Sequence, residues 1–148
     1  MATIERVRVI GIAVKSIEQS AKFYEGVLGL ERVWSGDYPE KPIQARVVKY
    51  VIGEVALNLM EPTDSESAVG RFIRKRGEGL FSLVLAVRPG GLDHLVSKGL
   101  KEAFPKRLVM KDADFGPGEH YAQATITWND PREGGVLFEL QELIRSAR

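Results

Sequence analysis

The pattern of apolar and polar positions predicts the same order of elements in each half of the chain. In the first half, residues 7–14 are rich in branched side chains, which is typical of a β-strand. Ser16 and Gln19 then have the spacing of a helix-capping pair, and apolar residues recur behind them at helical spacing. The helix is expected to stop at Gly29. Three further strands are predicted, at 30–35, 44–52 and 54–60, with a tight turn at Gly53.

The second half repeats this order, with a strand at 80–87, a helix at 92–100, and strands near 105–110, 120–128 and 135–141. Two βαβββ modules are the simplest account of the repeat. Their approximate limits are 5–62 and 78–143, with a helical connector at 63–77. We therefore expect one α+β domain over residues 1–148. Its two modules would form a curved mixed sheet around a cavity, with helices on the outer face.

Alternation along the predicted strands separates a bulky face from a face with smaller side chains and isolated polar groups. Glu139 lies on the second face of the segment 136–140, a carboxylate in an otherwise apolar strand, and Gln141 shares that face. Asn58 and Ser82 are the isolated polar groups of two other strands. Apolar walls with a few polar atoms are typical of a ligand cavity. The alternative is a sheet that tolerates these groups at an edge or in a dimer interface.

Composition narrows the class of protein. The 148 residues carry a net charge of +1, so neither nucleic acid nor a membrane is an expected partner. Cysteine is absent, which excludes disulfides and thiolate metal ligands. Residues 1–6 lack the apolar stretch of a signal peptide, and the longest apolar run, near 80–87, is far short of the ~18 residues of a membrane helix. A cytoplasmic location is expected.

Five stretches together resemble the vicinal oxygen chelate superfamily, which includes glyoxalase I, extradiol dioxygenases and bleomycin-resistance-like proteins. They are IGIAV (10–14), KFYEGVLGL (22–30), EPTD (61–64), RFIRKRGEGL (71–80) and GVLFEL (135–140). Their order and spacing are most similar to the methylmalonyl-CoA epimerases. The resemblance covers nearly the whole chain and implies the paired-module fold.

The resemblance also implies a metal site with one ligand from each of four strands, usually two histidines and two carboxylate or amide groups. The matching positions here are Val9, Asn58, Ser82 and Glu139, so both histidines are missing and only the last carboxylate is kept. One carboxylate and one amide are too few to hold a transition ion. We therefore expect no bound metal and no other cofactor.

The carboxylate base proposed for the epimerases is also hard to place. It belongs to the strand after the first helix, where residues 42–48 offer Gln44 and Arg46 but no acid. These two side chains are instead candidates for substrate binding. Ordinary metal-dependent epimerase chemistry is therefore not the expected activity.

Glu139 is the leading candidate for acid–base chemistry. In a dry cavity its pKa would be raised, so it would act as a general acid or base without metal. Asn58 and Ser82 would bind a substrate oxygen, and Val9 would line the same site. The alternative is that Glu139 only bonds Asn58 and Ser82 within the protein.

A second candidate region follows the loop 115–119. His120 begins a strand there and is a candidate acid–base group or replacement ligand, or neither. Tyr121 and Gln123 follow it and would add hydrogen-bonding groups if their polar set faces the cavity. The other histidine, His94, is predicted on a helix surface.

Three functions remain open. The first is a metal-independent isomerase or lyase that acts on a small oxo or acyl metabolite, with Glu139 moving a proton. The second is a non-catalytic binding or resistance protein for a small molecule. The third is a metalloenzyme with a rearranged site that uses Glu139, His120 and water. A homodimer is expected from the resemblance.

Overall fold

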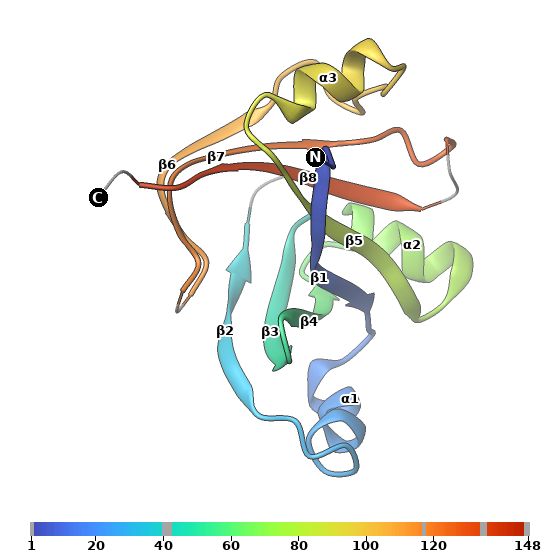
Figure 1. Cartoon of the computed structure of the whole chain (residues 1–148). Helices are drawn as coiled ribbons and strands as arrows, with labels where there is room; N and C mark the ends of the chain where they lie inside the picture. The colour runs from blue at the N-terminus through green and yellow to red at the C-terminus, as the bar shows by residue number, and fades with distance from the viewer. Residues whose placement is uncertain (1, 40–42, 117, 134–135, 147–148) are drawn as a thin grey trace. The chain divides into compact units, whose positions relative to one another are not determined.

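The computed structural model describes residues 2–39, 43–116, 118–133 and 136–146 (Figure 1). The strands are β1 (Ile4–Ala13), β2 (Arg32–Tyr38), β3 (Ala45–Ile52), β4 (Val55–Pro62), β5 (Gly79–Val87), β6 (Leu108–Asp114), β7 (His120–Trp128) and β8 (Leu137–Ile144). The helices are α1 (Ile17–Tyr24), α2 (Ala68–Arg76) and α3 (Gly91–Ser97).

The predicted α+β class and the twice-repeated βαβββ order are confirmed. The strands form one mixed sheet in the order β2-β3-β4-β1-β5-β8-β7-β6, in which β1 and β4 are parallel. The structure begins β6 three residues later than expected and ends α3 earlier. The first residue of the strand predicted at 135–141 lies outside the described residues. In the described part of the chain, no helix is long and apolar enough to cross a membrane.

Contacts divide the chain into two compact units. Unit 1 contains residues 1–8 and 83–148, and unit 2 contains residues 9–82. Strands β1 and β5 therefore contribute residues to both units. Each unit is described separately below.

In unit 2, helix α1 covers one face of the sheet and begins as the sequence predicts. The Ser16 hydroxyl accepts a hydrogen bond from the Gln19 backbone N–H at 3.2 Å, so it caps the helix. Ile17 then packs against a buried cluster that includes Tyr50 and Leu59. The Tyr50 hydroxyl donates to Glu25 at 2.6 Å, and burial together with this bond raises the pKa of Tyr50 to about 12. This cluster fixes which face of β3 and β4 is covered.

In unit 1, helix α3 packs against strand β8, as α1 packs against the strands of unit 2 (Figure 1). Leu92 on the helix and Leu140 on β8 belong to one buried cluster. The Glu142 carboxylate accepts the backbone N–H of Leu92 at 3.0 Å, so it ties the start of the helix to the same strand. Leu140 and Glu142 therefore face the helix, and Glu139 and Gln141 face the other way.

A buried asparagine fixes the start of β8. Asn129 is only 6% exposed, and its amide group donates to the backbone oxygens of Glu133 and Val136 at 3.3 and 3.2 Å. Its carbonyl oxygen accepts the backbone N–H of Phe138 at 2.8 Å. Because Phe138 directly precedes Glu139, this one side chain positions the segment that carries the candidate carboxylate.

Replacing Asn129 with alanine should destabilise the protein by about 1–3 kcal/mol, because one buried N–H and two carbonyl oxygens lose their partner. Urea unfolding followed by circular dichroism would measure the change. The exposed Lys106→Ala substitution is the control, with an expected change within about 0.5 kcal/mol. Equal stability of both variants would show that the three bonds contribute nothing to the fold.

Candidate functional site

Three of the predicted site residues lie on one face of the unit 2 sheet. Strand pairing places Asn58 of β4 opposite Gly11 of β1, and Val9, two residues before Gly11, therefore points to the same face. Ser82 of β5 lies beside Gly11, since a Cβ added to Gly11 would be 2.6 Å from the Ser82 hydroxyl oxygen. A larger residue at position 11 would require the Ser82 hydroxyl to shift. Unit 2 therefore brings Val9, Asn58 and Ser82 together.

The Asn58 side chain has an unmet hydrogen-bonding need. Asn58 is 6% exposed and Ser82 is 7% exposed. The side-chain oxygen of Asn58 is buried, and it has no hydrogen-bond partner among the described residues. A buried acceptor without a donor is unfavourable by about 1–3 kcal/mol, so it is a common mark of a place where a ligand or water binds.

Glu139 belongs to unit 1, where its surroundings favour the protonated form. Burial raises the pKa of this carboxyl above its usual value of 4.5, and the neighbouring Gln141 and Arg8 only partly oppose the rise. The Gln141 amide donates to the Glu139 carboxylate at 2.5 Å. On the adjacent strand Trp128 is paired with Glu139 and shares its face. The sequence-based expectation of a raised pKa and the structure therefore agree in direction.

Arg8 is a buried positive charge that is connected to Glu139 through Gln141. Its guanidinium donates to the Gln141 side-chain oxygen, and the Gln141 amide in turn donates to Glu139. Arg8 is 5% exposed, and its Nε is buried without a hydrogen-bond partner in the described part of the chain. The guanidinium carbon also lies 4.8 Å from the ring centre of Phe115, a cation–π contact. We call Arg8, Gln141 and Glu139 the relay.

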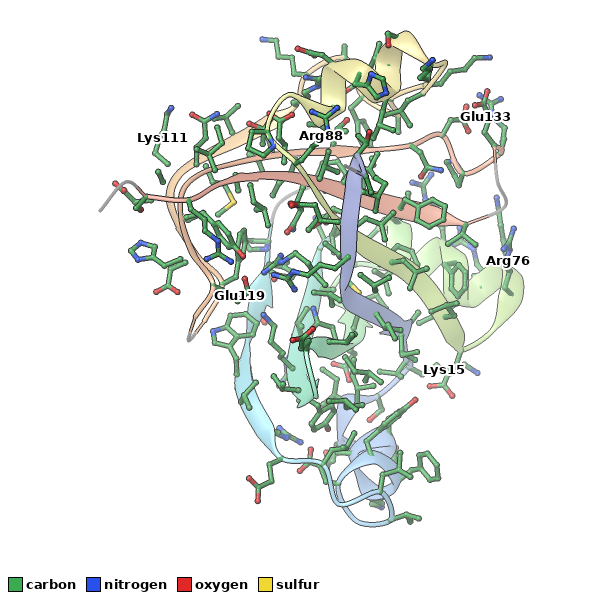
Figure 2. All side chains as sticks on the ribbon, in the orientation of Figure 1. Lys15, Arg76, Arg88, Lys111, Glu119 and Glu133 are labelled. Atoms are coloured by element: carbon green, nitrogen blue, oxygen red, sulfur yellow. The ribbon has the colours of Figure 1, made fainter. Side chains whose placement is uncertain are left out.

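A second carboxylate, Glu119, balances the arginine charge. It lies just before β7 and is labelled in Figure 2. It forms ion pairs with Arg6 at 2.9 Å and with Arg8 at 3.5 Å, and it accepts the Tyr121 hydroxyl. Burial raises the pKa of Glu119, but the bonds from Tyr121 and Arg6 outweigh it, so the net pKa is lowered. Glu119 is therefore a fixed negative charge, in contrast to Glu139.

The predicted residues of β7 lie in different surroundings. Tyr121 is buried, its ring centre lies 5.9 Å from the Arg8 guanidinium carbon, and its hydroxyl donates to Glu119. Gln123 instead contacts Lys111 and donates to Thr125 at 3.2 Å, and strand pairing puts Thr125 on the face opposite to Glu139. His120 is exposed at the start of the strand, paired with Asp114 through the backbone.

The other two candidates, Gln44 and Arg46, lie at the start of β3. Gln44 has a φ of 44°, and Arg46 is exposed on the face that α1 covers. Arg46 lines a pocket of about 440 Å³ together with Arg32, Ile17 and Glu61. The charged groups of this pocket bind one another: Glu61 accepts the Ile17 N–H at 2.9 Å and pairs with Arg46 at 3.6 Å. We therefore do not favour this pocket as the ligand site.

The side chains do not fit the metal site that the fold implies. Over residues 2–39, 43–116, 118–133 and 136–146, no group of three or more His, Cys, Asp and Glu side chains is placed to hold an ion. The four positions matched by resemblance hold an apolar valine, an amide, a hydroxyl and one carboxylate. Such a donor set is too poor for the divalent transition ions that histidine sites bind.

Arg8 is a site residue that the sequence pattern did not predict. A signal was present, because an arginine between two valines interrupts a strongly apolar strand. Its partner Gln141 lies 133 positions further along the chain, so local pattern could not pair them. Glu119 was missed for a similar reason, because its partner Arg6 lies 113 positions earlier in the chain.

Comparison with known proteins identifies the family. The model of the Glyoxalase/Bleomycin resistance protein/Dioxygenase superfamily matches residues 6–140. The uncharacterized protein YqjC of Bacillus subtilis is 33% identical over 134 residues, covering 90% of this chain and 89% of that protein. Mitochondrial methylmalonyl-CoA epimerase of Bos taurus is 24% identical over 143 residues, covering 93% of this chain and 74% of the relative.

Solved structures agree with this assignment. The hypothetical protein BH1468 from Bacillus halodurans C-125 has a TM-score of 0.77 and 28% identity, with 97% of each chain covered. Methylmalonyl-CoA epimerase from Mycobacterium tuberculosis has a TM-score of 0.77 and 22% identity, covering 99% of this chain and 92% of that one, and it supports the fold. This chain belongs to the Glyoxalase/Bleomycin resistance protein/Dioxygenase superfamily.

Proposed function

We propose that this protein is a metal-independent isomerase or lyase acting on a small oxo or acyl metabolite, with Glu139 as the acid–base group. The observation that carries the proposal is the desolvated Glu139 carboxyl, whose pKa is raised and which is held by the Gln141 amide. A carboxyl group exchanges protons with carbon most effectively when its pKa lies near the working pH. Its methylmalonyl-CoA epimerase relatives support an isomerase.

The proposed step is transfer of a proton from the carbon next to a carbonyl. The C–H bond breaks, the proton goes to the Glu139 carboxylate, and the electron pair moves onto the carbonyl oxygen as an enolate. The relay keeps Glu139 oriented, because Gln141 is itself held by the buried Arg8. Arg8 also supplies a fixed positive charge in the same unit, which favours the anionic states of the reaction. Val9, Asn58 and Ser82 of unit 2 are proposed separately as ligand-binding residues.

The main alternative is a non-catalytic binding or resistance protein. The relay supports this reading too, since Glu139 already has a hydrogen-bond donor within the protein. A structural carboxyl would need no substrate to satisfy it. Turnover therefore has to be measured directly.

The third candidate is a metalloenzyme with a rearranged site around Glu139 and His120. The exposure of His120 gives it little support, because a ligand set needs several side chains at one point. The proposal further includes a homodimer, suggested by the family resemblance, and a cytoplasmic location, which is the default expectation from the sequence.

Proton transfer can be tested before the natural substrate is known. The purified protein is incubated in D₂O with methylmalonyl-CoA, 2-oxobutyrate or phenylpyruvate, and deuterium at the carbon beside the carbonyl is followed by ¹H NMR. We expect catalysed exchange that falls about 100-fold or more in Glu139→Gln. The exposed Glu5→Gln substitution on β1 is the matched control and should leave the rate unchanged. Exchange that survives in Glu139→Gln would remove this carboxyl from the mechanism, and no exchange with any compound would favour the binding protein.

Chelation separates the metal-free proposal from the third candidate. Elemental analysis of the purified protein should find Zn, Mn, Co and Ni far below one ion per chain. Treatment with EDTA should change neither the melting temperature nor the exchange rate. Stoichiometric metal with a melting temperature that rises on adding the ion would instead establish a metal site.

Stability should depend on pH through Glu139. A carboxyl whose folded-state pKa is raised binds its proton more tightly in the folded state. Its favourable contribution is complete below the unfolded pKa, near 4.5, and is lost as the pH rises through the folded pKa. Glutamine stays neutral, so Glu139→Gln should gain stability relative to the native protein as the pH rises above about 4.5. Urea unfolding from pH 3 to 8 would measure the difference.

Glu102 supplies a control of opposite sign. The Arg107 guanidinium bonds Glu102 at 2.7 Å and lowers the pKa of that carboxyl. The stability that Glu102 contributes is present above its unfolded pKa and is lost as the pH falls through its folded pKa. The free energy of unfolding of Glu102→Gln should therefore decrease relative to that of the native protein as the pH rises from 3 towards 5. Parallel curves for the two variants would contradict the opposite shifts of these carboxyls.

A further inference from the structure

A row of four residues with complementary chemistry crosses the unit 2 sheet on the face that α1 does not cover. Strand pairing places Trp34 of β2 opposite Lys49 of β3, Lys49 opposite Asn58 of β4, and Asn58 opposite Gly11 of β1. Side chains at paired positions point to the same face. Ser82 adjoins Gly11 on that face, so its hydroxyl continues the row. We call Trp34, Lys49, Asn58 and Ser82 the cross-strand row.

The outer end of the row is an aromatic surface with a cation beside it. Trp34 is 43% exposed, and its indole lies across Gly36, where an added Cβ would be only 2.5 Å from the ring. Any larger residue at position 36 would displace the ring. The Lys49 ammonium lies 6.0 Å from the centre of the Trp34 ring, and the centre of the Tyr38 ring lies at the same distance from it. A ligand there would meet a flat ring and a positive charge.

The inner end of the row is buried and contains a hydrogen-bond acceptor without a donor. The Asn58 side-chain oxygen has no hydrogen-bond partner within the described residues, although Asn58 is more than nine-tenths buried. It can only accept, so the missing partner is an O–H or N–H group. The Ser82 hydroxyl can donate or accept beside it. The row therefore changes from aromatic and cationic on β2 and β3 to hydrogen-bonding on β4 and β5, across four strand spacings in all, roughly 19 Å.

We propose that the cross-strand row binds a small carboxylic acid that carries a planar apolar group and a hydroxyl, such as an aromatic 2-hydroxy acid or the enol of a 2-oxo acid. The ring lies on Trp34, the carboxylate meets the Lys49 ammonium, and the hydroxyl donates to the Asn58 oxygen. This inference rests on the proposed ligand-binding role of Asn58 and Ser82. It adds Trp34 and Lys49 as specificity residues and holds with or without turnover at Glu139.

Phenyllactate is the probe, because it has all three groups and no reactive bond. Three relatives each lack one group: 3-phenylpropanoate lacks the hydroxyl, 1-phenylpropan-2-ol lacks the carboxylate, and lactate lacks the ring. Binding is measured by titration in ¹⁵N–¹H NMR. The chain has two tryptophans, so the indole signal of Trp34 is assigned from Trp34→Phe. We expect phenyllactate to shift that signal and to bind about tenfold or more tightly than each of the three relatives.

Variants connect each group to its residue. Lys49→Met keeps the aliphatic stem and should weaken phenyllactate about tenfold, while leaving 1-phenylpropan-2-ol unchanged. Trp34→Leu should weaken both compounds. Lys22→Met, on the helix that packs against the other face, is the matched control and should bind phenyllactate normally.

The outcomes separate this inference from the proposed enzyme. If phenyllactate binding requires Trp34 and Lys49 and no compound exchanges deuterium, the result supports ligand binding by the cross-strand row and rejects catalysis by Glu139. Exchange that depends on Glu139, with binding unaffected in Trp34→Leu and Lys49→Met, would reject the row. Failure of phenyllactate to shift the Trp34 signal, or equal affinity for 3-phenylpropanoate, would overturn the ligand class.

Discussion

The relay is the interaction on which the chemistry of unit 1 depends. A partly buried carboxyl and a buried guanidinium lie in that unit, and an isolated buried charge is far too unfavourable to persist. The structure places Gln141 between Arg8 and Glu139, so that one amide group bonds both side chains. Arg8 also forms an ion pair with the second carboxylate, Glu119. Because Gln141 lies between them, Glu139 forms no direct ion pair with Arg8, and burial raises the pKa of Glu139.

The contrast between the two carboxyls shows why this arrangement matters. Glu119 accepts from Tyr121 and pairs with two arginines, so its pKa falls although it is partly buried. Glu139 interacts with two neutral donors, the Gln141 amide and the Trp128 side chain, and with the more distant Arg8 cation, but desolvation outweighs all three. The different partners of the two carboxyl groups shift their pKa values in opposite directions. The fold thereby produces one fixed charge and one exchangeable proton.

Much of this organisation could be predicted from the sequence. Periodicity located the helix after Ser16 and the alternation around Glu139, because both depend on neighbours close in the chain. The same logic grouped Tyr121 with Gln123, which the structure separates. Asp112, between the β6 partners of Gln123 and Tyr121, has a φ of 48°, a local backbone feature that side-chain alternation does not reveal. Residues that meet across more than a hundred positions, such as Arg8 and Gln141, have no local signature at all.

Loss of the family's histidines also changes what the remaining positions can do. A metal ion would occupy the lone pairs of an amide oxygen at Asn58, whereas the described residues leave that oxygen unpaired. An acceptor freed in this way can select a ligand by its hydroxyl, and a site that hydrogen-bonds a hydroxyl rejects analogues that lack it far more strongly than an apolar wall does. Lys49 lies on the neighbouring strand in register with Asn58, so charge and hydrogen bonding act on adjacent atoms of one small molecule. Recognition by such a row needs no metal, and its specificity follows from strand register alone.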